Sequence, residues 1–214
     1  LVANADKAII AYSGEVMEIT RAGCADPFHE VLEETCGCIL LFVGIVGLRL
    51  GKTGHQLVAD VCPLVSHNRF RVRVAAVRTL TAIILTGSHE MILELVAHRD
   101  PNTIPIKAFY EGDTKVNFCA RLATDRHAAV RVEFLTMLGE WLLKLPERRD
   151  HEQRLLPYVI SLVNDEVDSI STRALEIMEA LGAQYEADQK EDERVKEQRY
   201  YLPEEAQGLG WSQL

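Results

Sequence analysis

One spacing of mostly apolar side chains recurs four times in this chain, and it constrains the fold more than any other feature. In each copy an anchor residue is followed by further such side chains 4, 7, 8 and 11 positions later. Positions with that spacing lie on one face of an α-helix. We therefore expect four helices that each bury one face, with anchors at Val31, Val72, Val130 and Ile170.

A residue that favours a tight turn stands before each anchor. Three anchors have an aspartate five positions ahead, at Asp26, Asp125 and Asp165, and the remaining one has His67 there, followed by Asn68. Asp and Asn are good helix N-caps because a side-chain oxygen accepts a hydrogen bond from a free backbone N–H. We expect these residues to cap the long helices that follow them.

A shorter apolar segment precedes two of these turns, with Pro63 in one and Pro157 in the other. The repeating unit is then a helix, a tight turn and a second, longer helix. The anchors are 41, 58 and 40 residues apart, and a helix pair that repeats every 40–47 residues or so is typical of HEAT and armadillo arrays. The motif L-P-x-V…D-x-x-x-x-V-R-x-x-x-L resembles HEAT repeats in particular. The predicted fold is all-α, an α-solenoid of HEAT-type helical hairpins.

The stretch RFRVRV, residues 69–74, alternates arginine with apolar residues, which is also the pattern of a half-buried strand. The recurring helical spacing covers the same residues, so we expect a helix with Arg69 and Arg71 near its preceding turn. Arg73 directly follows its anchor, as Arg131 does. We expect Arg73 to play a structural role by reaching an aspartate in a neighbouring turn.

Two parts of the chain differ in composition. Residues 1–183 carry the repeats, about four to five of them, with an irregular insertion at residues 100–114 where two prolines disfavour regular helix. Residues 184–214 are predicted to form an acidic, charged helix or spacer that leads to a truncated next repeat. The sequence leaves open whether residues 184–206 are helical or disordered.

Charge and hydropathy exclude two classes of partner. The net charge of −9 repels phosphate backbones, so we expect no nucleic-acid partner. The longest apolar run, residues 38–48, is about half of the ~20 residues that a membrane helix needs, so we expect a buried helix and no membrane partner. The five cysteines lack the spacing of a disulfide framework, which favours a reducing compartment.

Three local patterns suggest chemistry but lack what that chemistry needs. In GLRLGKTG, residues 47–54, Val46 stands where a P-loop requires glycine, and a helical pattern precedes it. Cys36 and Cys38 would point in different directions on a helix, which suits no shared metal ion, and Cys38 is expected in the core. Residues 89–98 lack the HExxH spacing. We predict no catalytic residues, no metal site and no cofactor, and hence no enzyme.

Candidate partner-binding residues are charged positions near the turns or off the buried faces of the longer helices. Their mixed signs suit a protein surface of mixed charge better than a phosphate track. They are Arg69, Arg71, Arg78, Glu133, Glu140, Arg173, Glu176 and Glu179.

Four stretches in the second half of the chain carry a more specific pattern. They are GEWLLKLPERR (139–149), LLPYVISLVNDEVDSI (155–170), GAQYEADQKEDERVKE (182–197) and GLGWSQL (208–214). With them, the chain from Asp125 onward resembles a narrower family, the HEAT-repeat dynein axonemal assembly factors, of which it would be a fragment. Upstream of Asp125 only the general HEAT pattern supports the resemblance, and residues 194–207 depart from the family pattern.

The resemblance implies a non-enzymatic scaffold or co-chaperone for the cytoplasmic preassembly of axonemal dynein arms in ciliated or flagellated cells. Its partners would be axonemal dynein chains, chaperones and other dynein assembly factors, and it implies no cofactor. The alternative is a generic HEAT interaction module of the tubulin-binding or transport-receptor type. The sequence does not say which partner binds, or on which face.

Overall fold

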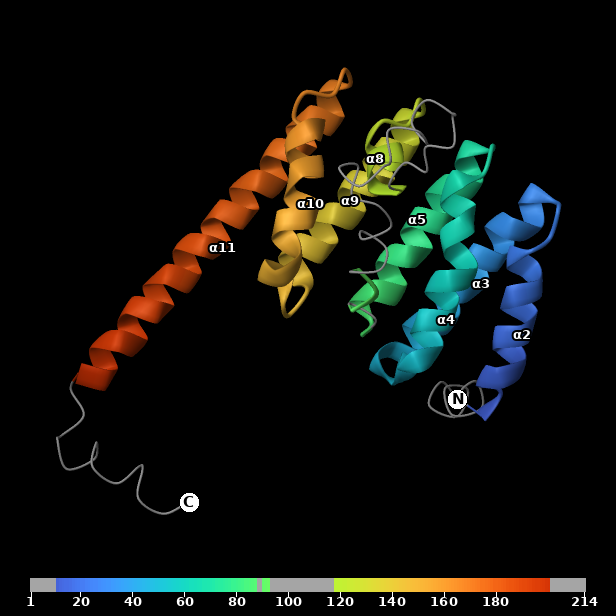
Figure 1. Ribbon diagram of the computed structural model, residues 1–214, viewed down its shortest axis with the longest axis horizontal. Helices are drawn as coiled ribbons and strands as arrows, with labels where there is room; N and C mark the ends of the chain where they lie inside the picture. The colour runs from blue at the N-terminus through green and yellow to red at the C-terminus, as the bar shows by residue number, and fades with distance from the viewer. Residues whose placement is uncertain (1–10, 88–89, 93–117, 201–214) are drawn as a thin grey trace, which may run out of the picture. The chain divides into compact units, whose positions relative to one another are not determined.

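The computed structural model describes residues 11–87, 90–92 and 118–200. All regular structure within these ranges is helical, which confirms the all-α prediction and places residues 70–74 in a helix rather than a strand (Figure 1). The elements are α2 (Ser13–Cys24), α3 (His29–Val46), the 3₁₀-helix η1 (Gly47–Leu50), α4 (Lys52–Val61), the 3₁₀-helix η2 (Cys62–Ser66), α5 (Phe70–Leu85), α8 (Phe118–Ala123), α9 (Ala128–Lys144), α10 (Arg148–Leu162) and α11 (Asp168–Tyr200).

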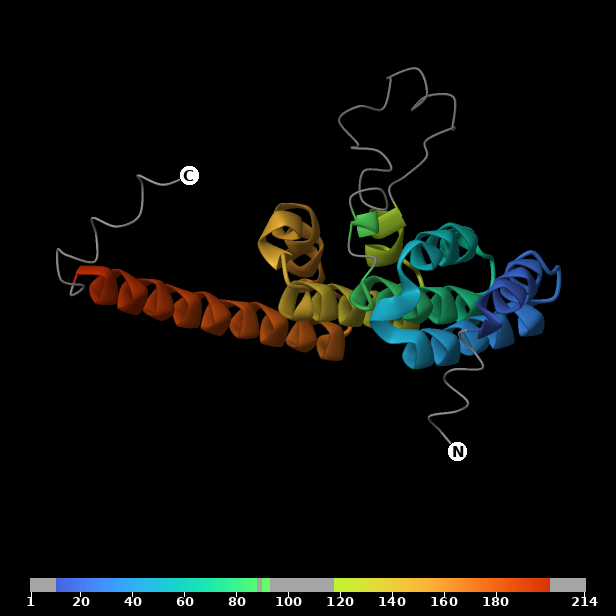
Figure 2. The ribbon, with the colours of Figure 1, turned by 90° about the horizontal axis from the view of Figure 1, so that it is seen from below.

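The chain divides into two compact units, residues 1–175 and residues 176–214. In the first unit the long helices α3, α5 and α9 lie side by side, because α5 packs against both of the others. The shorter helices α2, α4, α8 and α10 each pack against one of these long helices. Of these shorter helices, α4, α8 and α10 lie on the same side of the layer that α3, α5 and α9 form (Figure 2). This stacking of helical hairpins is the predicted α-solenoid.

The predicted buried faces are present in α5 and α9. Every template position of both helices is 0% exposed, which no surface helix would show. The ring of Phe134 also meets that of Tyr158 edge-on, with centroids 6.1 Å apart. The core positions are Val72, Ala76, Thr79, Leu80 and Ile83 in α5, and Val130, Phe134, Met137, Leu138 and Trp141 in α9.

Helix α3 departs from the template at two positions, Val31 and Cys38, which are exposed. Their equivalents in α5, Val72 and Thr79, are buried, and the Thr79 hydroxyl donates a hydrogen bond to the Cys36 carbonyl of α3. The corresponding face of α3 has no such neighbour among the described residues. The prediction of a core role for Cys38 is therefore wrong, and Cys36 is the buried cysteine of this pair.

The uncovered face of α3 continues through Leu41 and Ile45 to Leu48 in η1, all of which are exposed. Within the described part of the chain, the run His29–Leu50 is the one long and apolar enough to span a membrane, with a mean hydropathy of 2.0. The expectation based on residues 38–48 alone understated its length. Its opposite face packs on α2 and α5, as a core helix of a solenoid does, so its composition alone is weak evidence for a membrane span.

The turn residues act differently from the predicted N-caps. Asp26, Asp125 and Asp165 each accept a hydrogen bond from the backbone N–H two residues later, at 2.8–2.9 Å. This is an Asx turn, and it places the aspartate two residues before the N-cap of α3 and of α9. His67 takes the same place before α5, because its Nδ1 accepts from the N–H of Arg69 at 3.1 Å. The four turns thus share one geometry.

Two glycines with positive φ lie at helix ends in the stretch that resembles a P-loop. Gly47, with φ of 56°, follows the last turn of α3, and Gly51, with φ of 49°, separates η1 from α4. A side chain at either position would be strained. The expected turn between helices is thus reduced to these two glycines, because the rest of the stretch belongs to η1 and to the start of α4.

In the second unit the chain continues as the helix α11 to Tyr200. Side chains from residue 189 to residue 196 are all exposed, and Arg194 pairs with Glu191 at 2.8 Å. Residues 184–200 are therefore helical, which answers the question that the sequence left open for this part. Residues 201–214 and the insertion at 100–114 lie outside the described residues, and the division at residue 183 stays a prediction.

Candidate functional site

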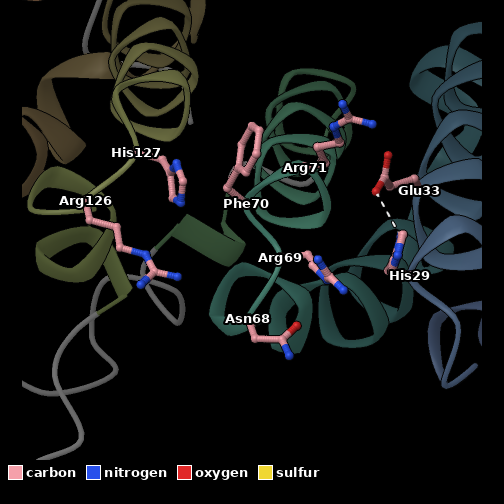
Figure 3. Close-up of a pocket in the computed structure, with 8 residues that line it drawn as sticks. All are labelled: His29, Glu33, Asn68, Arg69, Phe70, Arg71, Arg126 and His127. Carbon is pink, nitrogen blue, oxygen red and sulfur yellow. Dashed lines mark ion pairs between the residues drawn. The ribbon is translucent and has the colours of Figure 1, made fainter.

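The turns before α5 and α9 form one wall each of a cleft of about 430 Å³ (Figure 3). We call this the turn cleft. Its ionisable side chains are those of three exposed arginines, two histidines and one glutamate. The lining residues are His29, Glu33, Asn68, Arg69, Phe70, Arg71, Arg126 and His127.

An aromatic stack joins the two walls of the turn cleft. The rings of Phe70 and His127 lie 4.5 Å apart, with an angle of 19° between their planes. Phe70 is the first residue of α5, and His127 is the N-cap of α9. The stack therefore holds the starts of two neighbouring helices together, and it remains partly exposed to the cleft.

Two of the predicted partner-binding residues, Arg69 and Arg71, lie in the turn cleft, together with Arg126 and His127, which were not predicted. A signal for these two was available. Arg126 and His127 follow Asp125 in the same way that Asn68 and Arg69 follow His67. Because the repeats stack with the same turn geometry, equivalent turn residues become neighbours.

A second hollow of about 420 Å³ adjoins the turn cleft, since both are lined by Asn68 and Arg126. Here Arg121 of α8 donates a hydrogen bond to the Ser66 hydroxyl at 2.6 Å. Arg121 is exposed, so the positively charged surface extends beyond the turn cleft.

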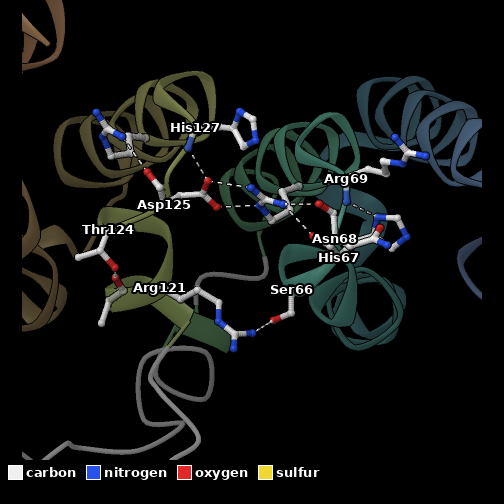
Figure 4. Close-up of polar contacts among 11 residues, drawn as sticks. Ser66, His67, Asn68, Arg69, Arg121, Thr124, Asp125 and His127 are labelled. Atoms are coloured by element: carbon white, nitrogen blue, oxygen red, sulfur yellow. Dashed lines mark hydrogen bonds and ion pairs between the residues drawn. The ribbon is translucent and has the colours of Figure 1, made fainter.

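Arg73 is buried, and it bonds to two residues that Figure 4 labels, Asp125 and His67. Its Nε and Nη2 donate to the two carboxylate oxygens of Asp125, each at 2.7 Å. Its Nη1 donates to the His67 carbonyl oxygen at 2.8 Å. One guanidinium therefore joins its own turn to the next one, which confirms the structural role predicted for Arg73. We call such a contact a rung.

A second rung joins the following pair of turns. Arg131 donates to both carboxylate oxygens of Asp165, at 2.7 and 2.9 Å, and to the carbonyl oxygen of Asp125 at 2.7 Å. Hydrogen bonds from Arg131 hold the pKa of Asp165 below its ordinary value, and the same bonds raise the pKa of Arg131. Bidentate Arg–carboxylate pairs of this kind fix geometry as well as charge.

No rung joins the turns before α3 and α5. At the position equivalent to Arg73, α3 has Leu32, which is buried. An aspartate at residue 67 would have no arginine at residue 32 to bind, so the turn needs only a side chain that accepts the backbone hydrogen bond, as His67 does. The lack of an arginine at residue 32 and the lack of an aspartate at residue 67 therefore belong together, because these two residues would be partners in a rung.

Of the other six predicted partner-binding residues, three are paired with charged neighbours and three are exposed on α11. Arg78 and Glu133 pair with each other across α5 and α9, at 2.7 and 3.2 Å, and the Glu133 side chain is only 15% exposed. Glu140 pairs with Lys144. Arg173, Glu176 and Glu179 are exposed on α11.

Four of the five thiols are kept unreactive by burial, and Cys38 is the exposed one. Burial raises the pKa of Cys24 to about 12 and that of Cys36 to about 11, and it also raises the pKa of Cys62 and Cys119. A thiol with a raised pKa is protonated at neutral pH and reacts slowly. Within the described residues, no three His, Cys, Asp or Glu side chains are placed to hold a metal ion. The arrangement is suited to binding through arginine.

The chain matches the family model described as "Dynein axonemal assembly factor 5-like, TPR repeats" over residues 1–101 and 112–198. The match therefore includes the region upstream of Asp125, where the sequence patterns alone carried no specific resemblance. TPR units repeat every 34 residues or so, whereas α3 and α5 begin 41 residues apart and α9 and α11 begin 40 apart. The repeat length agrees better with HEAT-type hairpins.

Curated relatives carry the same name. The chain is 26% identical to dynein axonemal assembly factor 5 of Xenopus laevis over 92% of its length, and 25% identical to that of Homo sapiens over 88%. It spans only 21% and 20% of these relatives. No solved structure matches it. With a family model that covers most of the sequence, the chain belongs to the dynein axonemal assembly factor 5-like family.

Proposed function

We propose that this chain is part of a non-enzymatic scaffold for the assembly of axonemal dynein arms in the cytoplasm of ciliated or flagellated cells. The observation that carries the proposal is the family match over residues 1–101 and 112–198, together with relatives that are named as dynein axonemal assembly factors. Axonemal dynein chains, chaperones and other assembly factors are the proposed partners.

The architecture supports a scaffold in two ways. Stacked helical hairpins present a continuous surface that grows with each added repeat, and such arrays bind partners over several units. The rungs at Arg73 and Arg131 fix two of the repeats against the ones that follow them, so the surface along these repeats keeps its shape. Because the chain spans about a fifth of its relatives, it supplies part of the whole protein's binding surface.

The alternative is a generic HEAT module that binds tubulin or transport cargo. A pull-down from the cytoplasm of ciliated cells, read by mass spectrometry, separates the two. With the tagged chain as bait, axonemal dynein chains and assembly factors should be enriched over a bait-free resin. Enrichment of tubulin or transport receptors without dynein proteins would contradict the proposal.

A variant tests the predicted contribution of α11. Arg173→Glu, Glu176→Lys and Glu179→Lys together reverse three exposed charges. We expect the triple variant to recover less dynein protein than the parent while its melting temperature changes little. Full recovery by a folded triple variant would exclude these three residues from the partner surface.

A further inference from the structure

We propose that the turn cleft binds an acidic peptide segment in which an apolar side chain lies between carboxylates. The inference rests on the proposed protein-binding function and names the chemistry of one partner segment. Arg69, Arg71 and Arg126 would hold the carboxylates, and the stack of Phe70 on His127 would receive the apolar side chain.

The charge of the turn cleft is the first support. Arg69, Arg71 and Arg126 are exposed, and within the described part of the chain no carboxylate pairs with them. Arg73 and Arg131, one or two turns of helix away, are each satisfied by an aspartate. The chain as a whole has a net charge of −9, so this is a local positive surface on an acidic protein. It should attract a negatively charged segment.

Helix direction adds to this charge. Helices α3, α5 and α9 begin at residues 29, 70 and 128, all within or beside the turn cleft. The N-terminal end of a helix carries a partial positive charge. Three such ends and three guanidinium groups therefore act with the same sign on one cleft.

The geometry favours carboxylates on a peptide over a phosphate group. A phosphate site needs donors that converge, and the backbone N–H groups of Phe28, Arg69 and His127 are already used by the turn side chains. The guanidinium groups of Arg69, Arg71 and Arg126 point in different directions rather than toward one point (Figure 3). Donors spaced along a cleft match charges that are spaced along a chain.

Two further features argue against nucleic acid and for an apolar contact. Glu33 forms part of the wall, where it pairs with His29 at 3.6 Å, and it would repel a continuous row of phosphates. The partly exposed stack of Phe70 and His127 offers an apolar surface between the arginines of the two turns (Figure 3). A volume of about 430 Å³ is within the usual range of ligand pockets.

Fluorescence anisotropy with labelled peptides tests the proposal on the chain as it is. One probe alternates glutamate with leucine, a second carries glutamine in place of each glutamate, and a third carries serine in place of each leucine. We expect the first to bind, the second to bind at least tenfold more weakly and the third to bind with intermediate affinity. Binding of the first should weaken as salt is raised, because exposed charges are screened.

Matched charge variants locate the site. Arg69→Gln, Arg71→Gln and Arg126→Gln together remove three positive charges from the turn cleft and should weaken peptide binding at least tenfold. Arg49→Gln, Arg154→Gln and Arg194→Gln remove the same charge from exposed positions elsewhere and should weaken it less than threefold. Both variants should melt within a degree or two of the parent.

The contrary outcomes are distinct. Equal losses in the two triple variants, or equal binding of the glutamate and glutamine peptides, would overturn the proposal. Tighter binding of a single-stranded oligonucleotide or of inorganic phosphate would assign the cleft to phosphate instead. A cleft variant that loses the peptide while the parent recovers no dynein protein from cytoplasm would leave the peptide site standing and remove the proposed function. Full recovery of dynein proteins by a chain that binds no acidic peptide would leave the proposed function standing and remove the peptide site.

Discussion

The junction between α5 and α9 and the junction between α3 and α5 are built on one plan, but only the first contains a rung. At the α5–α9 junction, Arg73 joins the two turns through Asp125 in a buried, bidentate contact. At the α3–α5 junction, Leu32 and His67 occupy the equivalent positions, and the packing there is apolar with one hydrogen bond from Thr79. The repeat fold thus tolerates either a charged or an apolar junction.

The comparison also separates two kinds of arginine. Arg73 is buried and serves the fold, whereas Arg69 and Arg71, four and two positions earlier, are exposed and have no carboxylate partner in the described residues. The helix sets this difference, because the position directly after the anchor faces the next turn and the positions before it face the solvent. A cluster of arginines in sequence is therefore divided by the fold into a buried structural arginine and exposed arginines.

The largest expected effect is the loss of a rung. Arg73→Ala leaves the carboxylate of Asp125 buried without its partner, so we expect the free energy of unfolding to fall by about 3–5 kcal/mol. Arg69→Ala, which removes the same side chain from the exposed position, should change it by no more than about 0.5 kcal/mol. Urea denaturation measures both. Similar losses for the two variants would erase the distinction between the two kinds of arginine.

The second rung makes stability depend on pH. The pKa of Asp165 is lowered in the folded chain, mainly by hydrogen bonds from Arg131. A lowered folded pKa contributes stability above the ordinary aspartate value of about 3.9, and that stability is lost as the pH falls through the lower, folded value. The urea midpoint of the parent should therefore fall steeply below about pH 4. Asp165→Asn should flatten this fall, and the exposed Asp192→Asn should not.

Much of this fold follows from the sequence, and the exceptions have physical causes. The helical spacing from Val72 and Val130 predicts the buried faces because each of these helices has neighbours on both sides. The same spacing wrongly predicts that Cys38 is buried. A face of a helix is buried only where a neighbouring helix covers it, and the sequence of the helix itself does not specify that neighbour. The turn cleft escaped prediction because Arg126 and Arg69 become neighbours only when repeats stack in register.

Thiol labelling sharpens the comparison at α3. Cys36 faces α5 and is buried, with a pKa raised to about 11, whereas Cys38 lies on the uncovered face. We expect a maleimide to modify Cys38 at least about tenfold faster than Cys36. Mass spectrometry of the single-cysteine variants gives both rates. Protection of Cys38 in the folded chain would show that residues outside the described ranges, or a second copy, cover this face.

The smallest expected effect is at the junction without a rung. His67→Asp restores the usual aspartate of the turn, and the new carboxylate can accept the same backbone hydrogen bond, but Leu32 offers it no partner. We expect a change in unfolding free energy of no more than about 1 kcal/mol in either direction. A gain well above that value would mean that an arginine or lysine from elsewhere reaches residue 67.

A double-mutant cycle at Arg73 and Asp125, measured by urea denaturation, tests the central claim most directly. If the two side chains form one buried rung, each single alanine variant should lose about 3–5 kcal/mol. The double variant should then lose less than the sum of the two singles, by a coupling of about 2–3 kcal/mol. The equivalent cycle at Leu32 and His67 should be additive within about 0.5 kcal/mol. Additive losses at Arg73 and Asp125 would contradict the account, because they would mean that the two turns are held together by something other than this contact.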